Sequence, residues 1–234
     1  MKQFLQNQKN LVQNVFNDVY DKYDLMNDFM SLGIHRLWKK DLIMMMSPYA
    51  NKKLIDVGCG TGDIGKLFLN TVKFKGSVYN VDPNKKMLDQ GKKRFKNLDN
   101  ISWHIGNAEN LKFKSNLFDY YTISFGLRNT KDISKSLKEA HRVLKPGGRF
   151  LCLEFSKISN SNLNFLYKNY SKIIPKVGKF IVGKSEPYEY LIKSIDKFIN
   201  QNQLVELMNK NGFENCKYRD LSGGIVSIHS GWKV

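Results

Sequence analysis

Short apolar runs alternate with helical patterns along the chain from Lys53 onward, and this alternation most constrains the fold. Brief apolar runs bounded by glycine and proline are typical of buried strands. We expect strands at 54–57, 77–82, 101–105, 118–125 and 149–155, with helices between them at 62–70, 84–97 and 132–144. This order is the signature of βαβ units. It predicts an α/β fold in which helices cover both faces of a mostly parallel sheet.

A different pattern follows the fifth predicted strand. Residues 157–200 are predicted to form a mostly helical insertion, and a further helix is predicted at 201–211. Two closing strands at about 213–219 and 224–230 are joined through Ser222-Gly223-Gly224. So short a connection indicates an antiparallel hairpin at one end of the sheet, which brings the predicted sheet to seven strands.

The whole chain, 1–234, is predicted to form one domain, with residues 1–50 as helices packed over the site. Its apolar content of 41% is enough for a core, which argues against a disordered chain. The three cysteines and four histidines are scattered, which predicts neither a disulfide framework nor a metal site. No run of 18 apolar residues and no apolar leader are present. We therefore expect a cytoplasmic protein without a membrane span.

The chain is strongly basic, with 38 Lys and Arg residues against 21 Asp and Glu residues and a net charge of +17. Such an excess attracts an anionic partner, which is a nucleic acid, a membrane surface or an acidic substrate. Six of the basic residues are arginine and the rest are lysine, a bias that genome composition also produces. The charge alone leaves both explanations open.

A glycine-rich loop, Val57-Gly58-Cys59-Gly60-Thr61-Gly62-Asp63, follows the first predicted strand and opens a helix. Glycines at such a place allow a tight turn and a close approach of backbone to a ligand. The spacing G-x-G-x-G is one residue shorter than the dinucleotide fingerprint. It suits an uncharged group better than a pyrophosphate. Asp56 lies two residues before the first glycine of this loop.

Two further polar elements follow the next two predicted strands. Asp82 closes the second strand, where a carboxylate accepts hydrogen bonds from both ribose hydroxyls of an adenosine. Asn107 and Ala108 follow the third strand, where a polar side chain and a backbone N–H meet an adenine edge. Because these elements end successive parallel strands, they and the glycine loop predict one nucleoside site.

Several motifs resemble known families. LIDVGCGTGD and VLKPGGRF are similar to the glycine loop and the fifth-strand turn of class I S-adenosylmethionine-dependent methyltransferases. A closer resemblance, from about Val15 to Lys233, is to the ubiquinone/menaquinone biosynthesis C-methyltransferases. It is carried by VFNDVYDKYDLMNDFMSLGIHRLWKK, ISFGLRNTKD, LEFSK and GIVSIHSGWK. Cys59 is a mild departure, because small residues are usual at that position.

The resemblance implies a Rossmann-like class I methyltransferase fold, S-adenosyl-L-methionine as methyl donor and no metal. In such a site Asp56 would pair with the donor's ammonium group or favour its sulfonium. The implied substrate is a polyprenylated benzoquinol or naphthoquinol that is methylated on a ring carbon. Both the match and the loop pattern give an expected set of cofactor-binding residues, which is Asp56, Gly58, Gly60, Thr61, Gly62, Asp82, Asn107, Ala108 and Ser124.

Catalysis of that reaction needs a fixed cation near a developing phenolate. Arg128 follows the fourth predicted strand, and we expect it to stabilise the phenolate oxygen while Asn129 orients that oxygen. The proton leaves through a water polarised by Arg128 or through a tyrosine such as Tyr23. The alternative role of Arg128 is a salt bridge to a neighbouring carboxylate, and that of Tyr23 is core packing.

The insertion carries an apolar helical stripe between Leu163 and Ile174 with lysines beside it. A basic amphipathic helix lies on an anionic membrane or lines an apolar channel, and core packing is the alternative. We expect this region and residues 34–46 to receive the polyprenyl tail. The protein would then associate peripherally with the inner face of the cytoplasmic membrane. Other quinone-biosynthesis enzymes and a second copy of the chain are open as partners.

Two other functions compete. An RNA methyltransferase would explain the charge, but residues 124–129 (SFGLRN) stand where enzymes acting on exocyclic amines carry Asn or Asp, Pro-Pro and an aromatic. No cysteine sits where a pyrimidine C5 nucleophile is needed, so no nucleic acid partner is expected. A non-catalytic scaffold of a quinone-synthesis complex is the other alternative, although the glycine loop, Asp82 and Arg128 are intact.

Overall fold

The chain divides into two compact units. The computed structural model describes residues 31, 33–158, 161, 162, 165, 167, 169 and 186–234. The larger unit comprises Leu37–Lys157 and Ile199–Val234, and the smaller one comprises Met1–Arg36 and Ile158–Phe198. Most of the predicted 163–174 stripe and all of residues 1–30 lie outside the described residues. The prediction of a single domain stays a prediction.

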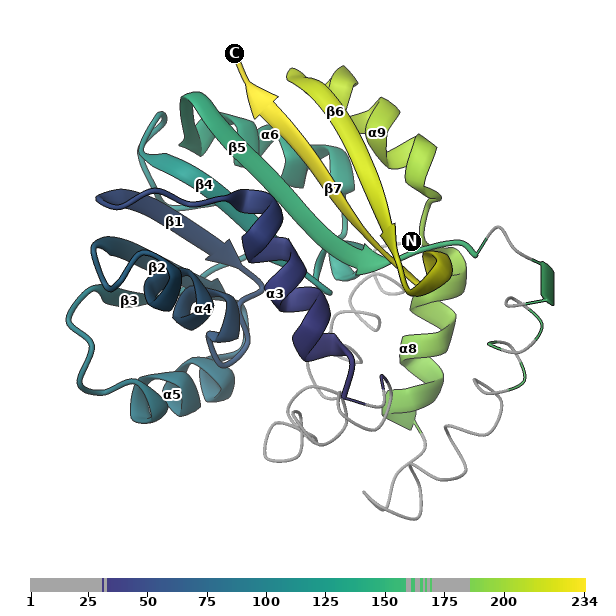
Figure 1. Cartoon of the computed structure of the whole chain (residues 1–234), viewed down its shortest axis with the longest axis horizontal. Coiled ribbons are helices and arrows are strands. Elements are labelled where there is room, and N and C mark those ends of the chain that lie inside the picture. Colours follow the sequence, from purple (N-terminus) through teal and green to yellow (C-terminus); the bar gives the residue numbers. More distant parts are fainter. Residues whose placement is uncertain are drawn as a thin grey trace, which may run out of the picture. The chain divides into compact units, whose positions relative to one another are not determined.

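The larger unit is built on a seven-stranded sheet. Its strands lie in the order β3-β2-β1-β4-β5-β7-β6 (Figure 1). The first five pair in parallel, while β7 runs antiparallel to both β5 and β6. This confirms the predicted mostly parallel sheet with a closing antiparallel hairpin. The strands are β1 Lys52–Val57, β2 Gly76–Asp82, β3 Ile101–Ile105, β4 Phe118–Ser124, β5 Leu144–Phe155, β6 Phe213–Leu221 and β7 Val226–Lys233.

Helices cover both faces of this sheet, as predicted. On one face lie α3 (His35–Met46), α4 (Asp63–Thr71) and α5 (Lys85–Arg94), and on the other lie α6 (Ile133–Val143) and α9 (Gln201–Lys210) (Figure 1). Buried side chains of α3 and α4 join those of the strands in one core cluster, which includes Trp38, Leu42, Phe68, Leu54 and Leu153. In the smaller unit, α8 (Glu186–Lys197) buries an apolar stripe of Tyr188, Leu191 and Ile195.

Local chemistry explains where the helices begin. The Asn84 side chain accepts hydrogen bonds from the backbone N–H groups of Lys86 and Met87, which caps α5. Asp132 caps α6 in the same way through the N–H of Lys135, and Asn200 and Gln203 form a capping box on α9. Each cap satisfies N–H groups that have no partner within their own helix.

The predicted start of the fifth strand was wrong by five residues. β5 begins at Leu144, which pairs with Phe118, and the register then shifts before Arg149 pairs with Tyr120. The Pro146-Gly147-Gly148 segment is therefore an irregularity within the strand, with Gly147 at a φ of +74°. Because proline lacks an N–H and this glycine is left-handed, the segment cannot continue a regular ladder.

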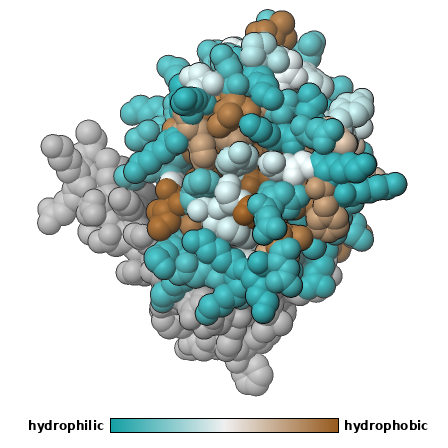
Figure 2. Space-filling view, turned by 90° about the vertical axis from the view of Figure 1, so that its left-hand side faces the viewer, coloured by the Kyte–Doolittle hydropathy of each residue, from teal (hydrophilic) through white to brown (hydrophobic). Residues whose placement is uncertain are grey.

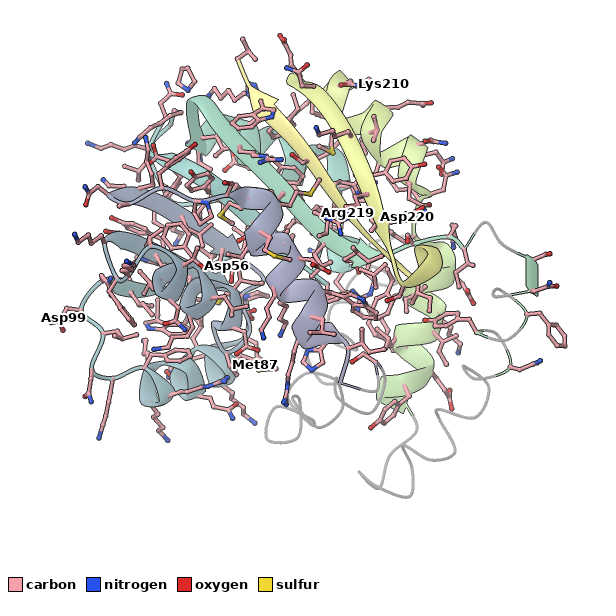
Figure 3. The ribbon with its side chains drawn as sticks, viewed as in Figure 1. Asp56, Met87, Asp99, Lys210, Arg219 and Asp220 are labelled. Atoms are coloured by element: carbon pink, nitrogen blue, oxygen red, sulfur yellow. The ribbon has the colours of Figure 1, made fainter. Side chains whose placement is uncertain are left out.

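The closing hairpin is joined by a short 3₁₀ helix over Ser222–Gly224, and β7 begins at Val226. The indole N–H of Trp38 donates to the Ser222 hydroxyl at 2.9 Å, which ties α3 to the hairpin. On β6, Asp220 (Figure 3) accepts from Gln201 Nε2 and from the Ser227 hydroxyl. These contacts fix the end of the sheet beside β5, the strand that flanks the site.

Candidate active site

The candidate residues meet where the strand order reverses. β1 lies between β2 and β4, and the helices that follow β1 and β4 cover opposite faces of the sheet. In open α/β sheets a ligand binds at such a switch point, outside the carboxyl ends of the strands. A Cβ atom added at Gly58 would lie 3.8 Å from the Cα of Gly126, so the loops after β1 and β4 approach each other here.

The glycine loop needs its glycines for backbone geometry. Gly58, Gly60 and Gly62 have φ values of +65°, +56° and +89°, in the left-handed region that other residues rarely adopt. A Cβ at Gly62 would also lie 2.6 Å from the Trp103 ring. The N–H groups of Gly58 and Cys59 donate to the Val81 carbonyl at 2.8 and 3.1 Å. The loop is therefore held against the end of β2.

Asp82 joins the loop to the helix that follows. One carboxylate oxygen accepts from the Gly60 N–H at 2.9 Å, and the other accepts from the Asn84 N–H at 2.8 Å. Burial raises the pKa of Asp82 to about 6, against these two hydrogen bonds, which lower it. The carboxylate thus lies at the carboxyl end of β2 in the position predicted for a ribose ligand.

Asp56 is a buried acid with one oxygen available. It lies toward the carboxyl end of β1 (Figure 3) and is 1% exposed. Its Oδ1 accepts from the Thr122 hydroxyl at 2.7 Å, while Oδ2 has no hydrogen-bond partner among the described residues. Burial raises the pKa of Asp56 to about 7, which the Thr122 hydrogen bond and the Lys39 charge partly oppose. A cation placed beside Oδ2 would satisfy this oxygen.

The remaining predicted ligands follow β3 and β4. Ser124 ends β4, and its hydroxyl is buried without a partner within the described part of the chain. Asn107 is exposed and Ala108 is buried, just beyond β3. The Asp82 carbonyl accepts the N–H of Gly106, which places Asn107 next to the end of β2. All the predicted cofactor residues therefore lie at one end of the sheet.

A hollow of about 360 Å³ lies at the outer edge of the same region. Figure 2 faces this side of the molecule and shows hydrophobic patches within a mostly hydrophilic surface. The hollow follows β3, and its lining consists of Val81, Lys92, Trp103, His104, Ile105, Gly106, Leu111, Lys112 and Phe113. It adjoins Gly106 and so lies beside the predicted adenine end of the site.

Thr61 and Asp63 interact with basic side chains. Arg94 donates to the Thr61 hydroxyl at 3.3 Å and to Asp63 at 2.9 Å, and Lys39 pairs with the other oxygen of Asp63 at 2.8 Å. Asp63 also lies in the first turn of α4, where a carboxylate favours the helix dipole. Its interactions are those of a structural acid that links α3, α4 and α5.

Arg128 and Asn129 lie in η2 (Leu127–Asn129), directly after β4. The side chain of Arg128 is 5% exposed and pairs with Glu154 at 2.6 Å, so the salt bridge that the sequence left as an alternative is present. The sequence analysis did not single out Glu154, although an acid inside the mostly apolar run RFLCLEF (149–155) was a usable signal. Tyr23 lies outside the described residues.

The thiols offer no nucleophile. Burial raises the pKa of Cys59 and of Cys152 well above the ordinary value, and that of Cys216 to about 11. A thiol with a raised pKa stays protonated and is unreactive near neutral pH. Over the described residues, no group of three His, Cys, Asp or Glu side chains is arranged to hold a metal ion.

These residues fit S-adenosylmethionine. Asp56 Oδ2 and the Ser124 hydroxyl are buried polar atoms without a hydrogen-bond partner among the described residues, and a ligand bound beside the glycine loop would satisfy them. Asp82 offers a carboxylate to a ribose, and the three glycines of the loop carry no side chain that would keep a ligand from their backbone. Asp56, Asp82, Ser124 and the residues after β3 are the groups that would hold it.

Comparison with known proteins decides the family. The sequence profile of the ubiE/COQ5 methyltransferase family matches residues 2–233. The chain belongs to this family. Relatives within the ubiE/COQ5 family include proteins named ubiquinone/menaquinone biosynthesis C-methyltransferase UbiE. That of Rickettsia bellii (strain OSU 85-389) is 48% identical over 233 residues, 97% of this chain and 94% of the relative. That of Rickettsia prowazekii (strain Madrid E) is 48% identical, covering 96% and 93%.

Solved structures share the fold of this ubiE/COQ5 member. A SAM-dependent methyltransferase of Thermotoga maritima, described as a possible histamine N-methyltransferase, superposes with a TM-score of 0.67 at 22% identity, over 95% of this chain and 99% of that one. Phosphoethanolamine N-methyltransferase 2 of Haemonchus contortus, in complex with S-adenosyl-L-methionine, gives a TM-score of 0.62 at 16% identity, over 83% and 52%. These likenesses confirm the predicted Rossmann-like class I methyltransferase fold.

Proposed function

We propose that this protein transfers a methyl group from S-adenosyl-L-methionine to a ring carbon of a polyprenylated quinol in ubiquinone or menaquinone biosynthesis. The observation that carries the proposal is the family match over residues 2–233, in a chain whose glycine loop, Asp56 and Asp82 form an intact cradle. Relatives that share about 48% of the sequence bear the name of this activity.

The chemistry requires the reduced form of the substrate. A quinone ring carbon is electrophilic, whereas a quinol that loses a hydroxyl proton places negative charge on its ring carbon. S-adenosylmethionine supplies an electrophilic methyl group when it is bound. The ring carbon would take that methyl group as the bond from sulfur to methyl breaks and S-adenosylhomocysteine leaves. Loss of the ring carbon's own proton to a water then restores the aromatic ring. Holding the partners in line and excluding water contributes on the order of 7–11 kcal/mol to such a step.

The chain's own residues divide the work. We assign Asp82 to the ribose, Asp56 to a cationic part of the donor, and the backbone after β3 to the adenine. Arg128 stabilises the phenolate oxygen, and Asn129 orients that oxygen. The N–H of Asn129 donates to the Gly126 carbonyl, and that of Gly62 to the Cys59 carbonyl, so each of the two loops is closed by a turn at its own strand end.

A transfer assay tests the function. The full-length protein is given methyl-labelled S-adenosylmethionine with chemically reduced demethylated benzoquinol, with demethylmenaquinol, or with total RNA. We expect label in a quinol and none when the quinone is left oxidised, since oxidation removes the nucleophile. Label in RNA alone would overturn the proposal. Cofactor binding without transfer to any acceptor would instead support a scaffold.

The outer face of α3 supports a peripheral contact with a membrane, which we propose as the route to a polyprenylated substrate. Leu37 and Met44 are 57% and 66% exposed and lie about two helical turns apart, and Lys40 is exposed between them. Exposed apolar side chains beside a lysine are typical of a helix at an anionic lipid surface. Among the described residues no helix is long and apolar enough to cross a membrane.

Flotation with vesicles of anionic phospholipid tests this contact. The double variant Leu37→Gln/Met44→Gln should bind about tenfold more weakly, since partial burial of two such side chains contributes about 1.4 kcal/mol. Phe74→Gln is the matched control, because Phe74 is 46% exposed on the turn after α4. Equal binding by the two variants would exclude α3 as the contact.

A further inference from the structure

The ion pair between Arg128 and Glu154 is the most deeply buried charge pair among the described residues, with side chains 5% and 1% exposed. Arg128 follows β4, and Glu154 lies near the carboxyl end of β5. Ser124 pairs with Leu153 in the parallel ladder, so the two strand ends lie next to each other. Both partners therefore lie at the carboxyl ends of the parallel strands, on the side of the sheet that carries the proposed active site.

The Glu154 carboxylate binds both the backbone N–H and the guanidinium of Arg128. Oε1 of Glu154 accepts from Arg128 Nη1 at 2.6 Å and from the Phe155 N–H at 2.9 Å. Oε2 accepts from the backbone N–H of Arg128 at 3.3 Å. The same Nη1 donates to the Phe125 carbonyl at 2.6 Å, and the Phe155 ring lies 5.4 Å from the guanidinium carbon. The guanidinium has little freedom to turn.

Stability alone is a weak reason for such an arrangement. Removing two charges from water is costly, and apolar side chains of similar volume often stabilise a fold as well as a buried pair does. What the pair adds is a fixed direction for a cation, since charge-assisted hydrogen bonds to a planar guanidinium define its plane. A cation that must meet a developing phenolate benefits from that fixed direction.

We propose that Glu154 is the positioning residue for Arg128 and sets the orientation in which Arg128 meets the quinol oxygen. This inference rests on the proposed function. Glu154 acts through Arg128, and the inference gives it no contact with the substrate.

Steady-state kinetics of Glu154→Gln give the first test. We expect kcat to fall by about 10- to 100-fold, with KM for the quinol and the dissociation constant of S-adenosylmethionine within about twofold of wild type. The reason is that the amide cannot accept from both Arg128 groups. Glu139→Gln is the matched control, because Glu139 forms a 2.7 Å pair with Arg142 on α6. That variant should keep its kcat.

Chemical rescue separates positioning from a structural role. Arg128→Ala should regain at least tenfold in kcat when guanidinium is added, because the Glu154 carboxylate binds the free cation. The double variant Arg128→Ala/Glu154→Gln should regain less than twofold. Equal rescue in both backgrounds would overturn the proposal. If Glu154→Gln does not fold, Glu154→Asp keeps the charge and moves the carboxylate by one methylene. The same kcat loss is then expected.

The wild-type protein in the same assay distinguishes the two failures. No label in any quinol overturns the proposed function, and the role of Glu154 with it. Labelled quinol from wild type, with Glu154→Gln within twofold in kcat, overturns the positioning role and leaves the function standing.

Discussion

Replacing Asp82 by asparagine should weaken the binding of S-adenosylmethionine by about 100-fold. Hydrogen bonds to a charged acceptor contribute about 1.5–3 kcal/mol each, and the variant loses charge toward two ribose hydroxyls. It also disturbs the loop, because the Asp82 oxygens accept from Gly60 and Asn84 at 2.9 and 2.8 Å. The amide NH2 of asparagine can only donate, so either the Gly60 N–H or the Asn84 N–H would lose its acceptor.

Isothermal titration with S-adenosylmethionine and with S-adenosylhomocysteine measures this loss. Asp99→Asn makes the same chemical change at an exposed acid between α5 and β3 (Figure 3), and it should bind both ligands as wild type does. A dissociation constant for Asp82→Asn within about threefold of wild type would remove Asp82 from the proposed site.

Much of the fold was predictable because its signals are local. Glycine follows the last residue of β1 and of β3 and so indicates where these strands end. In the glycine loop, the residues with left-handed backbone angles are the glycines themselves. The register of parallel strands then brings Asp56, Asp82 and Ser124 to one edge without further information. That is why the candidate cofactor residues follow from spacing and from the family resemblance.

Other parts depend on contacts between distant residues. No periodicity links Arg128 to Glu154 or Thr122 to Asp56. Thr122 and Asp56 meet across neighbouring strands, and Glu154 on β5 meets Arg128 in the short helix after β4. The start of β5 was misplaced because Pro146 and Gly147 read as a turn, although pairing with Phe118 begins before them. A strand can continue pairing on both sides of such an irregularity. The local sequence does not show whether it does, because that depends on the partner strand.

The affinity for S-adenosylmethionine should rise with pH through the titration of Asp56. The sign follows from the direction of its pKa. Burial raises the pKa of Asp56 from 3.8 to about 7, so the ligand-free folded protein holds this proton up to neutral pH. This bound proton also stabilises the folded, ligand-free protein. Its contribution to the free energy of unfolding is full below the ordinary pKa of 3.8 and is lost as the pH rises through 7. A cationic ligand favours the ionised acid, so binding below pH 7 releases a proton.

The pH dependence of the affinity for S-adenosylmethionine should be large, because Asp82 also binds a proton in the ligand-free protein and releases it on binding. Each proton released changes the dissociation constant by up to about tenfold per pH unit below the pKa. With pKa values of about 7 for Asp56 and about 6 for Asp82, affinity should fall by up to about 1,000-fold from pH 7 to pH 5. The two acids share one site, so the measured values belong to the pair.

Titrations in two buffers of different ionisation enthalpy count the released protons. Wild type should release about one proton at pH 6.5, and Asp56→Asn should release a small fraction of one, since Asp82 alone remains. Asp56→Asn should also bind about tenfold more weakly at pH 8, and between pH 6 and 7 it should keep only the roughly twofold dependence that Asp82 contributes. Protonation of the ligand's own amino group cancels between the two proteins. If wild type and Asp56→Asn release equal numbers of protons, Asp56 stays protonated in the complex, and the cation must be held by backbone carbonyls instead.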